Sequence, residues 1–223
     1  MKAMILAAGR GERLRPLTER TPKPLVVAGG KALIDWHLGR HAAAGLREAV
    51  INVSHLAEQI VAHVGDGARY GMRITFSREA QPLETAGGIA QARALLGEEP
   101  FLLVNSDIYC ECDFAALRAL HLGAKLAHLV LVPNPAHHAE GDFTLDAGMV
   151  GNGAPPRYTY AGVAIMSPAM VAGVRAGDKA PLGPLLRQAA DARRLAGELY
   201  RGLWTDVGTL ARLDELNTLL SKR

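Results

Sequence analysis

The polarity pattern of the chain alternates short apolar runs with longer amphipathic stretches. The apolar runs are typical of strands buried in a sheet, and the amphipathic stretches have the spacing of helices. The predicted strands of the first part are Met4–Ala8, Ala49–Val53, Arg73–Ser77, Phe101–Asn105 and His128–Val132. The predicted helices between them are Leu33–Ala44, Ala57–Val64, Ile89–Leu96 and Phe114–Leu122. This alternation predicts an α/β fold with a mostly parallel sheet.

The last third of the chain has a less regular pattern. Its predicted elements are a hairpin in Gly141–Val150, a flexible loop in Gly148–Pro156, a strand over Arg157–Met166, a helix over Pro184–Leu195, and a terminal helix that begins after the sequence WTDVGT. We find no internal repeat, low-complexity tail or linker. The sequence therefore predicts a single domain over residues 1–223.

Composition excludes several classes of protein. Of the 223 residues, 49% are hydrophobic and 21% charged, as in ordinary globular proteins. The net charge of +3 is spread along the chain, so we expect no nucleic acid partner. No apolar stretch approaches the roughly 20 residues of a membrane span, and no signal peptide is recognisable. Cys110 and Cys112 are too close for an ordinary disulfide. We expect a cytoplasmic protein, a monomer or a small homo-oligomer, with no membrane partner.

The first predicted strand runs into a loop that is rich in glycine and cations. Gly9 and Gly11 let backbone N–H groups approach an anion closely, and Arg13 supplies positive charge. Lys23 lies between two prolines, which restrict the backbone and present the side chain in a fixed direction. These features fit a polyphosphate. The alternative is an ordinary strand-to-helix turn with solvated charges.

A second candidate segment is Glu79–Gly88, which reads EAQPLETAGG and is predicted as a loop. Its paired glycines allow the backbone to lie against a flat ligand. The side chain of Glu79 is an acceptor for an N–H group such as that of a pyrimidine base. The alternative is a plain loop with a threonine that caps the next helix.

Two aspartates are candidate metal ligands. Asp107 follows the predicted strand Phe101–Asn105, and ligands of open α/β sheets bind beyond the carboxyl ends of strands. Asp206 lies in the predicted tight turn of WTDVGT. Carboxylate oxygens are ligands that Mg²⁺ prefers. The alternatives are a turn or helix-cap role for Asp107 and a structural turn at Asp206, while Asp113 is predicted to cap the next helix.

The stretch LAAGRGERLRPLTERTPKPL resembles the signature of the sugar-phosphate nucleotidyltransferases, roughly LxxGxGxRLxPLTxxxPKPL. The residues that match it are Leu6, Gly9, Gly11, Arg13, Leu14, Pro16, Leu17, Thr18, Pro22, Lys23, Pro24 and Leu25. The stretches PLETAGG, VNSD and WTDVGT resemble the base-binding loop and the two metal-aspartate segments of that family, in the same order. The resemblance implies a Rossmann-like fold and transfer of a nucleotidyl group from a nucleoside triphosphate to a sugar 1-phosphate, with release of pyrophosphate.

The resemblance also implies the site. Arg13, Lys23 and Asp107 are the implied catalytic residues, and Asp107 and Asp206 the implied Mg²⁺ ligands. The implied nucleotide-binding residues are Leu6, Ala7, Ala8, Gly9, Gly11, Arg13, Lys23, Glu79, Leu83, Glu84 and Gly88. The implied sugar-binding residues are Asn105, Gly141, Asp142, Tyr160 and Gly162. Arg157, in APPRYTY, is the candidate substitute for a lysine with which many relatives grip the sugar phosphate.

Within that family, the segments LETAGG, NPxHHxxGDF and YTYAGV resemble those of members that use UTP and N-acetylmuramic acid 1-phosphate in peptidoglycan recycling. UTP and this sugar phosphate are thus the implied partners. One alternative keeps the enzyme class with other substrates, as in mannose-1-phosphate guanylyltransferase or glucose-1-phosphate thymidylyltransferase. A more distant alternative is a non-catalytic nucleotide-sensing domain, against which the presence of both Asp107 and Asp206 counts. His137 and His138 are predicted to be loop or surface residues rather than metal ligands.

Overall fold

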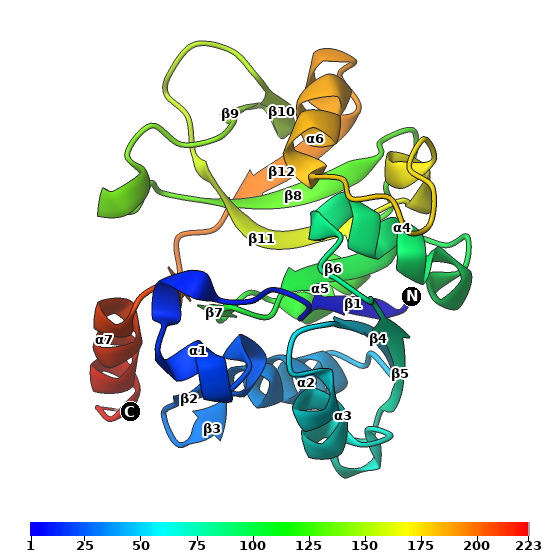
Figure 1. Cartoon of the computed structure of the whole chain (residues 1–223). Coiled ribbons are helices and arrows are strands. Elements are labelled where there is room, and N and C mark those ends of the chain that lie inside the picture. The colour runs from blue at the N-terminus through cyan, green and yellow to red at the C-terminus, as the bar shows by residue number, and fades with distance from the viewer. Residues whose placement is uncertain (223) are drawn as a thin grey trace.

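The computed structural model describes residues 1–222, and within them a nine-stranded mixed sheet forms the centre of the molecule (Figure 1). In spatial order, its strands are β5 (Arg73–Arg78), β4 (Glu48–Val53), β1 (Ala3–Leu6), β6 (Phe101–Asn105), β11 (Thr159–Met166), β8 (Ala127–Val132), β12 (Leu195–Leu199), β10 (Met149–Gly151) and β9 (Thr144–Asp146). Strands β5, β4, β1 and β6 are all parallel, whereas β11 is antiparallel to both of its neighbours. The predicted α/β fold with a mostly parallel sheet is confirmed.

Helices cover both faces of this sheet (Figure 1). Helices α2 (Leu33–Ala43), α3 (Ala57–Val64) and α5 (Phe114–Arg118) pack on the face to which Ala3 and Ile5 point. Helices α4 (Glu84–Leu96) and α6 (Leu182–Asp191) pack on the other face, with Met4. Because side chains alternate along a strand, one short apolar run supplies both cores. Strands β1, β4 and β6 are therefore mostly apolar, and polar site residues are expected at their ends.

Smaller elements complete the chain around this core. They are α1 (Leu17–Arg20), α7 (Leu210–Leu220), the paired strands β2 (Val27–Ala28) and β3 (Lys31–Ala32), the paired strands β7 (Ile108–Cys110) and β13 (Trp204–Asp206), and the 3₁₀ helices η1 (Glu12–Leu14), η2 (Lys23–Leu25), η3 (Ala68–Tyr70), η4 (Ala136–His138) and η5 (Pro168–Val171). Helix α7 packs on a third apolar cluster, in which Leu213 and Leu216 meet Leu33 of α2. This packing attaches the C-terminal helix to the N-terminal half of the chain.

Several predicted boundaries are wrong. Helix α4 begins at Glu84 and not at Ile89, so Gly87 and Gly88 lie inside a helix rather than in a loop. A Cβ on Gly87 would lie 2.3 Å from the carbonyl oxygen of Asp178, so the glycine is needed for close helix packing rather than for a turn. The helix predicted over Phe114–Leu122 ends at Arg118.

Predicted boundaries in the C-terminal part of the chain also differ from the structure. The helix predicted over Pro184–Leu195 spans Leu182–Asp191, because Arg193 takes a positive φ of 56° and ends it. Leu195 instead begins β12, where it is fully buried. The predicted hairpin is confirmed as β9 and β10, joined at Ala147 and Gly148, and β10 occupies part of the segment that was predicted to be a flexible loop.

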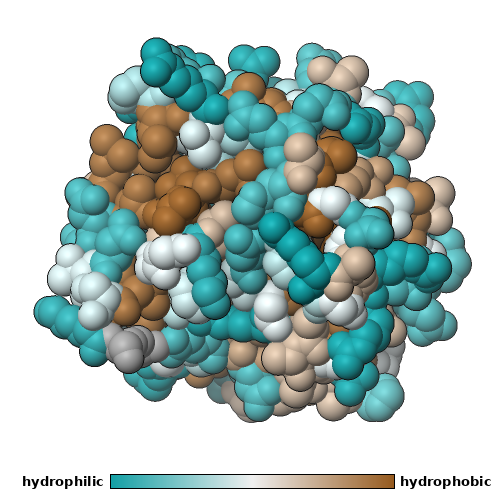
Figure 2. Space-filling view, turned by 90° about the horizontal axis from the view of Figure 1, so that it is seen from below, coloured by the Kyte–Doolittle hydropathy of each residue, from teal (hydrophilic) through white to brown (hydrophobic). Residues whose placement is uncertain are grey.

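Few large hydrophobic side chains of the described residues are exposed to solvent. Large hydrophobic side chains that are exposed are Met1, Val27, Leu210 and Leu219. Figure 2 shows the underside of the molecule, where hydrophobic residues form an area bordered by hydrophilic ones. Within residues 1–222, no helix has the length and apolar character needed to cross a membrane.

Candidate active site

The carboxyl ends of β1, β4 and β6 form the floor of a pocket of about 210 Å³, which we call the glycine-loop pocket. Its position agrees with the rule that ligands of open α/β sheets bind beyond these strand ends. The sequence-predicted residues that line it are Leu6, Ala7, Ala8, Gly9, Lys23, Glu79, Glu84, Asn105 and Asp107. Segments far apart in the chain thus meet here.

The two glycines of the first loop have different roles. Gly11 takes a left-handed φ of 64°, and its carbonyl oxygen accepts a hydrogen bond of 2.8 Å from the hydroxyl of the buried Thr18. Gly9 has ordinary backbone angles, and a Cβ placed there would meet no atom within 4 Å. Gly11 therefore makes the turn, whereas Gly9 leaves backbone open toward the pocket, as an anion-binding loop requires.

One buried network joins this loop to the predicted base-binding segment. The carboxylate of Glu79, 6% exposed, accepts bonds from Asn52 Nδ2 at 2.7 Å and from Leu83 N at 2.9 Å. Asn52 Oδ1 in turn accepts from Ala7 N at 2.8 Å. Gly88 packs on the same groups, since a Cβ there would lie 2.7 Å from Asn52 Nδ2. Leu83 and Gly88 thus support the network without lining the pocket.

Asn52 was missed by the sequence reasoning. It is the polar residue near the end of the apolar run AVINV, and the run was read only as a strand. A polar side chain at the carboxyl end of a buried parallel strand is the signal that could have identified it. Glu84, which also lines the glycine-loop pocket, has a left-handed φ of 61°. This conformation costs a non-glycine residue of the order of 1 to 3 kcal/mol and often occurs at functional sites.

The two predicted metal aspartates lie on paired segments. Strand β13 pairs with β7 so that Asp206 is opposite Ile108, and Val207 N donates to Asp107 O at 2.7 Å. Both carboxylates line a second pocket of about 370 Å³, which we call the aspartate pocket. It is also lined by Arg13, Asn105, His137, His138, Tyr160, Gly162 and Trp204.

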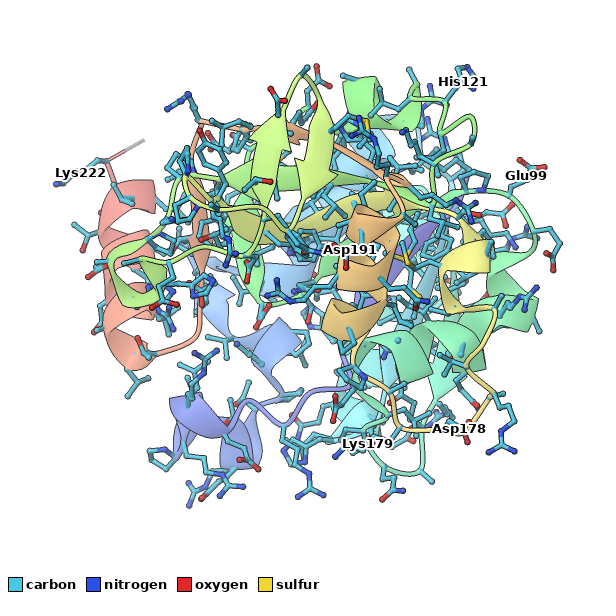
Figure 3. The ribbon with its side chains drawn as sticks, turned by 90° about the horizontal axis from the view of Figure 1, so that it is seen from above. Glu99, His121, Asp178, Lys179, Asp191 and Lys222 are labelled. Carbon is cyan, nitrogen blue, oxygen red and sulfur yellow. The ribbon has the colours of Figure 1, made fainter. Side chains whose placement is uncertain are left out.

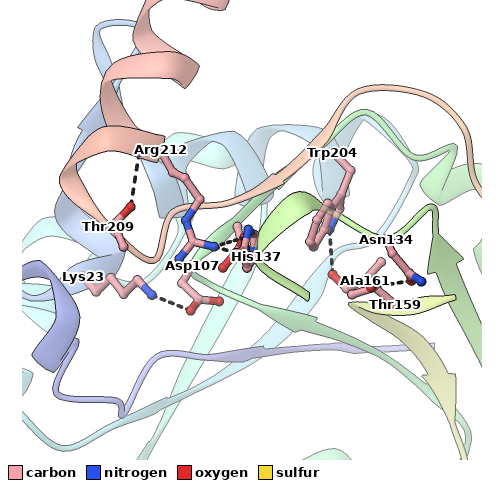
Figure 4. Close-up of polar contacts among 10 residues, drawn as sticks. Lys23, Asp107, Asn134, His137, Thr159, Ala161, Trp204, Thr209 and Arg212 are labelled. Atoms are coloured by element: carbon pink, nitrogen blue, oxygen red, sulfur yellow. Dashed lines mark hydrogen bonds and ion pairs between the residues drawn. The ribbon is translucent and has the colours of Figure 1, made fainter. Parts of the chain in front are cut away.

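Each aspartate is paired with a cation (Figure 4). Lys23 Nζ lies 2.6 Å from Asp107 Oδ2. Asp206 Oδ1 lies 2.8 Å from Arg212 Nη1 and 3.1 Å from His137 Nε2. Lys23 and Arg212 are largely buried, with side chains 11% and 12% exposed. A metal ion or substrate phosphate entering this pocket would therefore meet preformed pairs of opposite charge.

Arg212 and His137 are site residues that the sequence reasoning did not use. Arg212 lies in the first turn of α7, where Thr209 caps the helix by accepting from Arg212 N at 3.4 Å. His137 belongs to the surface turn η4, as predicted, and its side chain is 43% exposed, yet it contacts Asp206. The available sequence signal is an arginine near the start of the predicted terminal helix, six positions after the WTDVGT aspartate.

A third pocket of about 410 Å³ lies between strands β6 and β11 and helix α6, and we call it the α6 pocket. The predicted sugar residues Asn105, Asp142 and Tyr160 line it. Asp142 is held by Tyr160 N, which donates to Oδ2 at 2.8 Å, and by His138 Nε2 at 3.0 Å from Oδ1. Asn105 lines all three pockets, so they meet at this residue.

The two glycines predicted to bind sugar allow backbone conformations that a larger residue would not. Gly141, with φ of 65°, is a tight turn whose Cβ position lies 2.6 Å from Asn134 Oδ1, and it lines none of the three pockets. Gly162, with φ of 74°, lies at the register shift of β11, and a Cβ there would meet Asn105 Nδ2 at 2.7 Å. Gly162 therefore allows the Asn105 side chain to lie against β11.

The suggestion that Arg157 replaces the sugar-phosphate lysine is not supported by its contacts. Its guanidinium donates to the carbonyl oxygens of Gly153 at 3.0 Å and Asn152 at 3.2 Å. It lines none of the three pockets. Because these bonds are made within its own loop, Arg157 fixes that loop and does not face the aspartates.

A buried histidine supports the strand that follows Asp107. His37 of α2 is 1% exposed, and its Nε2 donates to the carbonyl oxygen of Ile108 at 2.9 Å. Burial lowers the pKa of His37 from 6.5 to about 4. The ring is thus neutral at pH 7, with its proton on Nε2. Cys110, on the same strand, and Cys112 are buried free thiols.

Comparison with known proteins connects this geometry with a family. The family model for nucleotidyl transferases matches residues 2–143. The N-acetylmuramate alpha-1-phosphate uridylyltransferase of Neisseria meningitidis serogroup B is 50% identical over 98% of this chain and 98% of its own. The protein of the same name from Caulobacter vibrioides is 40% identical over 92% of this chain and 91% of its own.

A more distant solved structure has the same fold. It comes from Bacillus anthracis and is named as a glucose-1-phosphate thymidylyltransferase in complex with a sucrose. It superposes with a TM-score of 0.89 over 100% of this chain and 96% of its own, at 17% identity. Together with the family match and the relatives at 40% and 50% identity, the fold and the strand-end site lead to one conclusion: the chain belongs to the nucleotidyl transferase family.

Proposed function

We propose that the protein transfers UMP from UTP to N-acetylmuramic acid α-1-phosphate, giving UDP-N-acetylmuramic acid and pyrophosphate. The names of the relatives from Neisseria and Caulobacter support these substrates. The observation that carries the proposal is the meeting of three pockets at Asn105, with the Lys23–Asp107 pair at the boundary of the glycine-loop and aspartate pockets. Such an arrangement offers separate space for a nucleotide, for reacting phosphates and for a sugar.

In this reaction a phosphate oxygen of the sugar attacks the α-phosphorus of UTP, and pyrophosphate leaves from the opposite side. Both reactants are anions, so the protein has to neutralise charge and align them. Lys23 would contact the α-phosphate, and its position in the wall of the glycine-loop pocket together with Gly9 supports this role. Arg13 lines the aspartate pocket, is exposed and forms no ion pair within the described chain, so it is available for the triphosphate.

The donor set of the aspartate pocket fits Mg²⁺. Asp107 and Asp206 supply two carboxylates, and substrate phosphates with water would complete an oxygen coordination shell. Bound there, Mg²⁺ would polarise the α-phosphate and neutralise part of its charge. Lys23 and Arg212 hold the two carboxylates in place in the absence of the ion. Within residues 1–222 no group of three or more histidine, cysteine or acidic side chains is arranged to hold a metal ion.

Base recognition is assigned to the Glu79 network. A carboxylate has about four acceptor positions, and Asn52 and Leu83 use two of those of Glu79. A further position remains for the N3–H group of uracil. The glycine-loop pocket contains Glu79, Pro82 and Thr85 on this side, so a base would lie against the beginning of α4.

A panel of substrates tests the assignment. Each of UTP, GTP and dTTP is combined with N-acetylmuramic acid, mannose and glucose 1-phosphates, and pyrophosphate release is measured. We expect UTP with the muramic acid derivative to give the highest kcat/KM. A preference for GTP with mannose 1-phosphate or for dTTP with glucose 1-phosphate would contradict the proposal, and these are the activities named for more distant relatives. Absence of turnover with every pair would favour the nucleotide-sensing alternative.

The cellular setting is part of the same proposal. The product is the activated form in which muramic acid can be reused for the cell wall, so we place the reaction in peptidoglycan recycling. A cytoplasmic location agrees with two free thiols. We further propose that residues 1–223 act as one catalytic domain, since the central sheet takes strands from both halves of the chain.

A further inference from the structure

Arg187 occupies a wall of the α6 pocket. It follows Leu182 and Leu186 on α6, and both leucines are buried against the core while also lining the pocket. Arg187 is exposed on the same helix. Figure 3 shows α6 from above, with Asp191 at its end. The wall formed by α6 is therefore apolar with one cation beside it.

The guanidinium of Arg187 lies over an aromatic ring and has no acidic partner among the described residues. Its Cζ lies 5.4 Å from the centroid of the Phe143 ring, and Phe143 is 3% exposed. Nη1 donates to the carbonyl oxygen of Asp142 over a long 3.4 Å. No carboxylate within residues 1–222 forms an ion pair with it. Stacking on an aromatic ring holds the planar group while its remaining donors stay available.

The acids that line the pocket, in contrast, already have partners. Glu84 Oε1 lies 3.4 Å from Lys179 Nζ. Asp142 is bonded to His138 and to Tyr160 N. The charge that remains unpaired at this wall is thus positive, and the ligand group that matches it is an anion next to apolar atoms.

N-acetylmuramic acid carries such a group, since its lactyl ether combines a carboxylate with a methyl. We propose that Arg187 binds the lactyl carboxylate of the acceptor sugar, with Leu182 and Leu186 against the adjacent methyl group. The inference rests on the proposed function, and it names the residue that distinguishes a muramic acid derivative from N-acetylglucosamine 1-phosphate, which lacks the lactyl group. A planar guanidinium suits a carboxylate because it donates two parallel hydrogen bonds.

The arrangement of the pockets supports this assignment. Asn105 and Tyr160 line both the aspartate pocket and the α6 pocket. A sugar that contacts both residues would have its 1-phosphate on the side of Asp107 and its ring substituents on the side of α6. The hydroxyl of Tyr160 is buried and lacks a hydrogen-bond partner among the described residues, and this burial raises its pKa. The 1-phosphate would then lie on the side of Arg13 in the aspartate pocket, and the lactyl carboxylate on the side of Arg187.

The test compares two acceptors in two variants. Arg187→Met removes the cation, and Arg157→Met is the matched control, because Arg157 is a neighbouring arginine that lines none of the three pockets. With UTP saturating, kcat/KM and the dissociation constant are measured for N-acetylmuramic acid 1-phosphate and N-acetylglucosamine 1-phosphate. Loss of a charge-assisted bond is expected to lower kcat/KM for the muramic acid derivative about 10- to 100-fold in Arg187→Met, mainly through KM. The change for N-acetylglucosamine 1-phosphate is expected to stay below about threefold.

Two further measurements make the outcome decisive. Arg187→Lys keeps the charge without the planar fork and should recover part of the loss. On the unchanged protein, a muramic acid 1-phosphate whose lactyl carboxylate is converted to the amide should show a similar loss, which requires no variant to fold. Equal losses for both sugars would mean that Arg187 binds a shared group such as the 1-phosphate, and would overturn the inference. No loss for either sugar would overturn it as well. If the unchanged protein does not use N-acetylmuramic acid 1-phosphate at all, the proposed function fails in the first measurement, before any variant is compared.

Discussion

Lys23 Nζ lies 2.6 Å from Asp107 Oδ2, although the two residues are 84 positions apart in the chain. The pair joins the cation of the N-terminal loop to the carboxylate that follows β6. The Lys23 side chain is 11% exposed and that of Asp107 32%, so the contact is only partly screened by solvent. Any ligand that binds one member of the pair must also change the surroundings of the other.

Lys23→Met is expected to lower kcat by about 10² to 10³, because one aligned donor to the reacting phosphate is lost. Pyrophosphate release with saturating substrates measures it. Lys31→Met is the control, since Lys31 lies on β3 against the Trp36 ring and outside the pockets, and it should keep full activity. A Lys23 variant that turns over at the normal rate while folded would contradict the assigned role.

Asp107→Asn should abolish Mg²⁺-dependent turnover while leaving the fold intact. The amide keeps the shape of the side chain but loses the charge that attracts the metal ion. Circular dichroism and thermal unfolding check the fold. Asp113→Asn provides a comparison: Asp113 is a helix cap that accepts from Ala116 N at 2.9 Å, and asparagine also caps helices well. Full Mg²⁺-dependent activity in Asp107→Asn would exclude Asp107 as a metal ligand.

Arg212→Met should reduce kcat about 10-fold or more, because Asp206 loses the hydrogen-bonded ion pair that orients its carboxylate. Arg212→Lys should recover part of the activity, since its ammonium can still reach the carboxylate. Activity is titrated with Mg²⁺ to separate metal affinity from turnover. Arg175→Met, an exposed arginine paired only with Asp178, serves as the control. Unchanged kinetics in Arg212→Met would show that Asp206 needs no support.

Gly88→Ala is expected to weaken UTP binding. Its Cβ would lie 2.8 Å from Glu79 Oε1 and 2.7 Å from Asn52 Nδ2, so the buried network would have to shift. The dissociation constant for UTP is measured by calorimetry. Gly39→Ala also places an alanine in a helix, but its Cβ would meet nothing within 4 Å, and it should bind UTP normally. Equal affinity in both variants would contradict the role of the network in base recognition.

The buried His37 predicts an acid-sensitive fold. In the unfolded chain its pKa is 6.5, and in the folded protein it is about 4, so between these values the unfolded state binds more protons. The free energy of unfolding should therefore fall as the pH decreases from 6.5 to 4, with about 3 kcal/mol from this residue. His41, whose pKa is also lowered by burial, adds to the same trend.

Urea unfolding at pH 7 and pH 5 measures this dependence. His37→Gln keeps a donor for the Ile108 carbonyl but cannot titrate, so its stability should change less between the two pH values. His121→Gln is the control, since His121 is exposed at the periphery of the molecule (Figure 3). An equal pH dependence in the wild type and His37→Gln would contradict the assignment.

Much of the site is readable from the sequence because its residues follow apolar strands. Asn105 is the last residue of the run FLLVN and Asp107 follows it by two positions, while Gly9 follows β1 by three positions. Parallel strands place their carboxyl ends at one edge, so residues in these positions meet without further information. Glu79, which follows β5, is predictable on the same ground.

Partners that come from other elements were not predictable in this way. Arg212 reaches Asp206 only because α7 packs back on α2 and β2, and His137 only because η4 lies beside β13. Arg187 has its position from the packing of α6 on the sheet and from the ring of Phe143. Gly87 and Gly88 look like loop residues in the sequence, yet they are helical, since close contacts with Asp178 and Asn52 leave no room for a side chain.

The sequence by itself determined the alternation of strands and helices in the first part of the chain, the glycine-rich cationic loop and the family signature. These depend on local polarity, backbone freedom and spacing, which are properties of consecutive residues. The tertiary structure decided which cation faces which carboxylate, where α4 and α6 begin and end, and which side chains close the sugar side of the site. Those depend on contacts between elements distant in the chain, and their energies exist only once the core has brought the elements together.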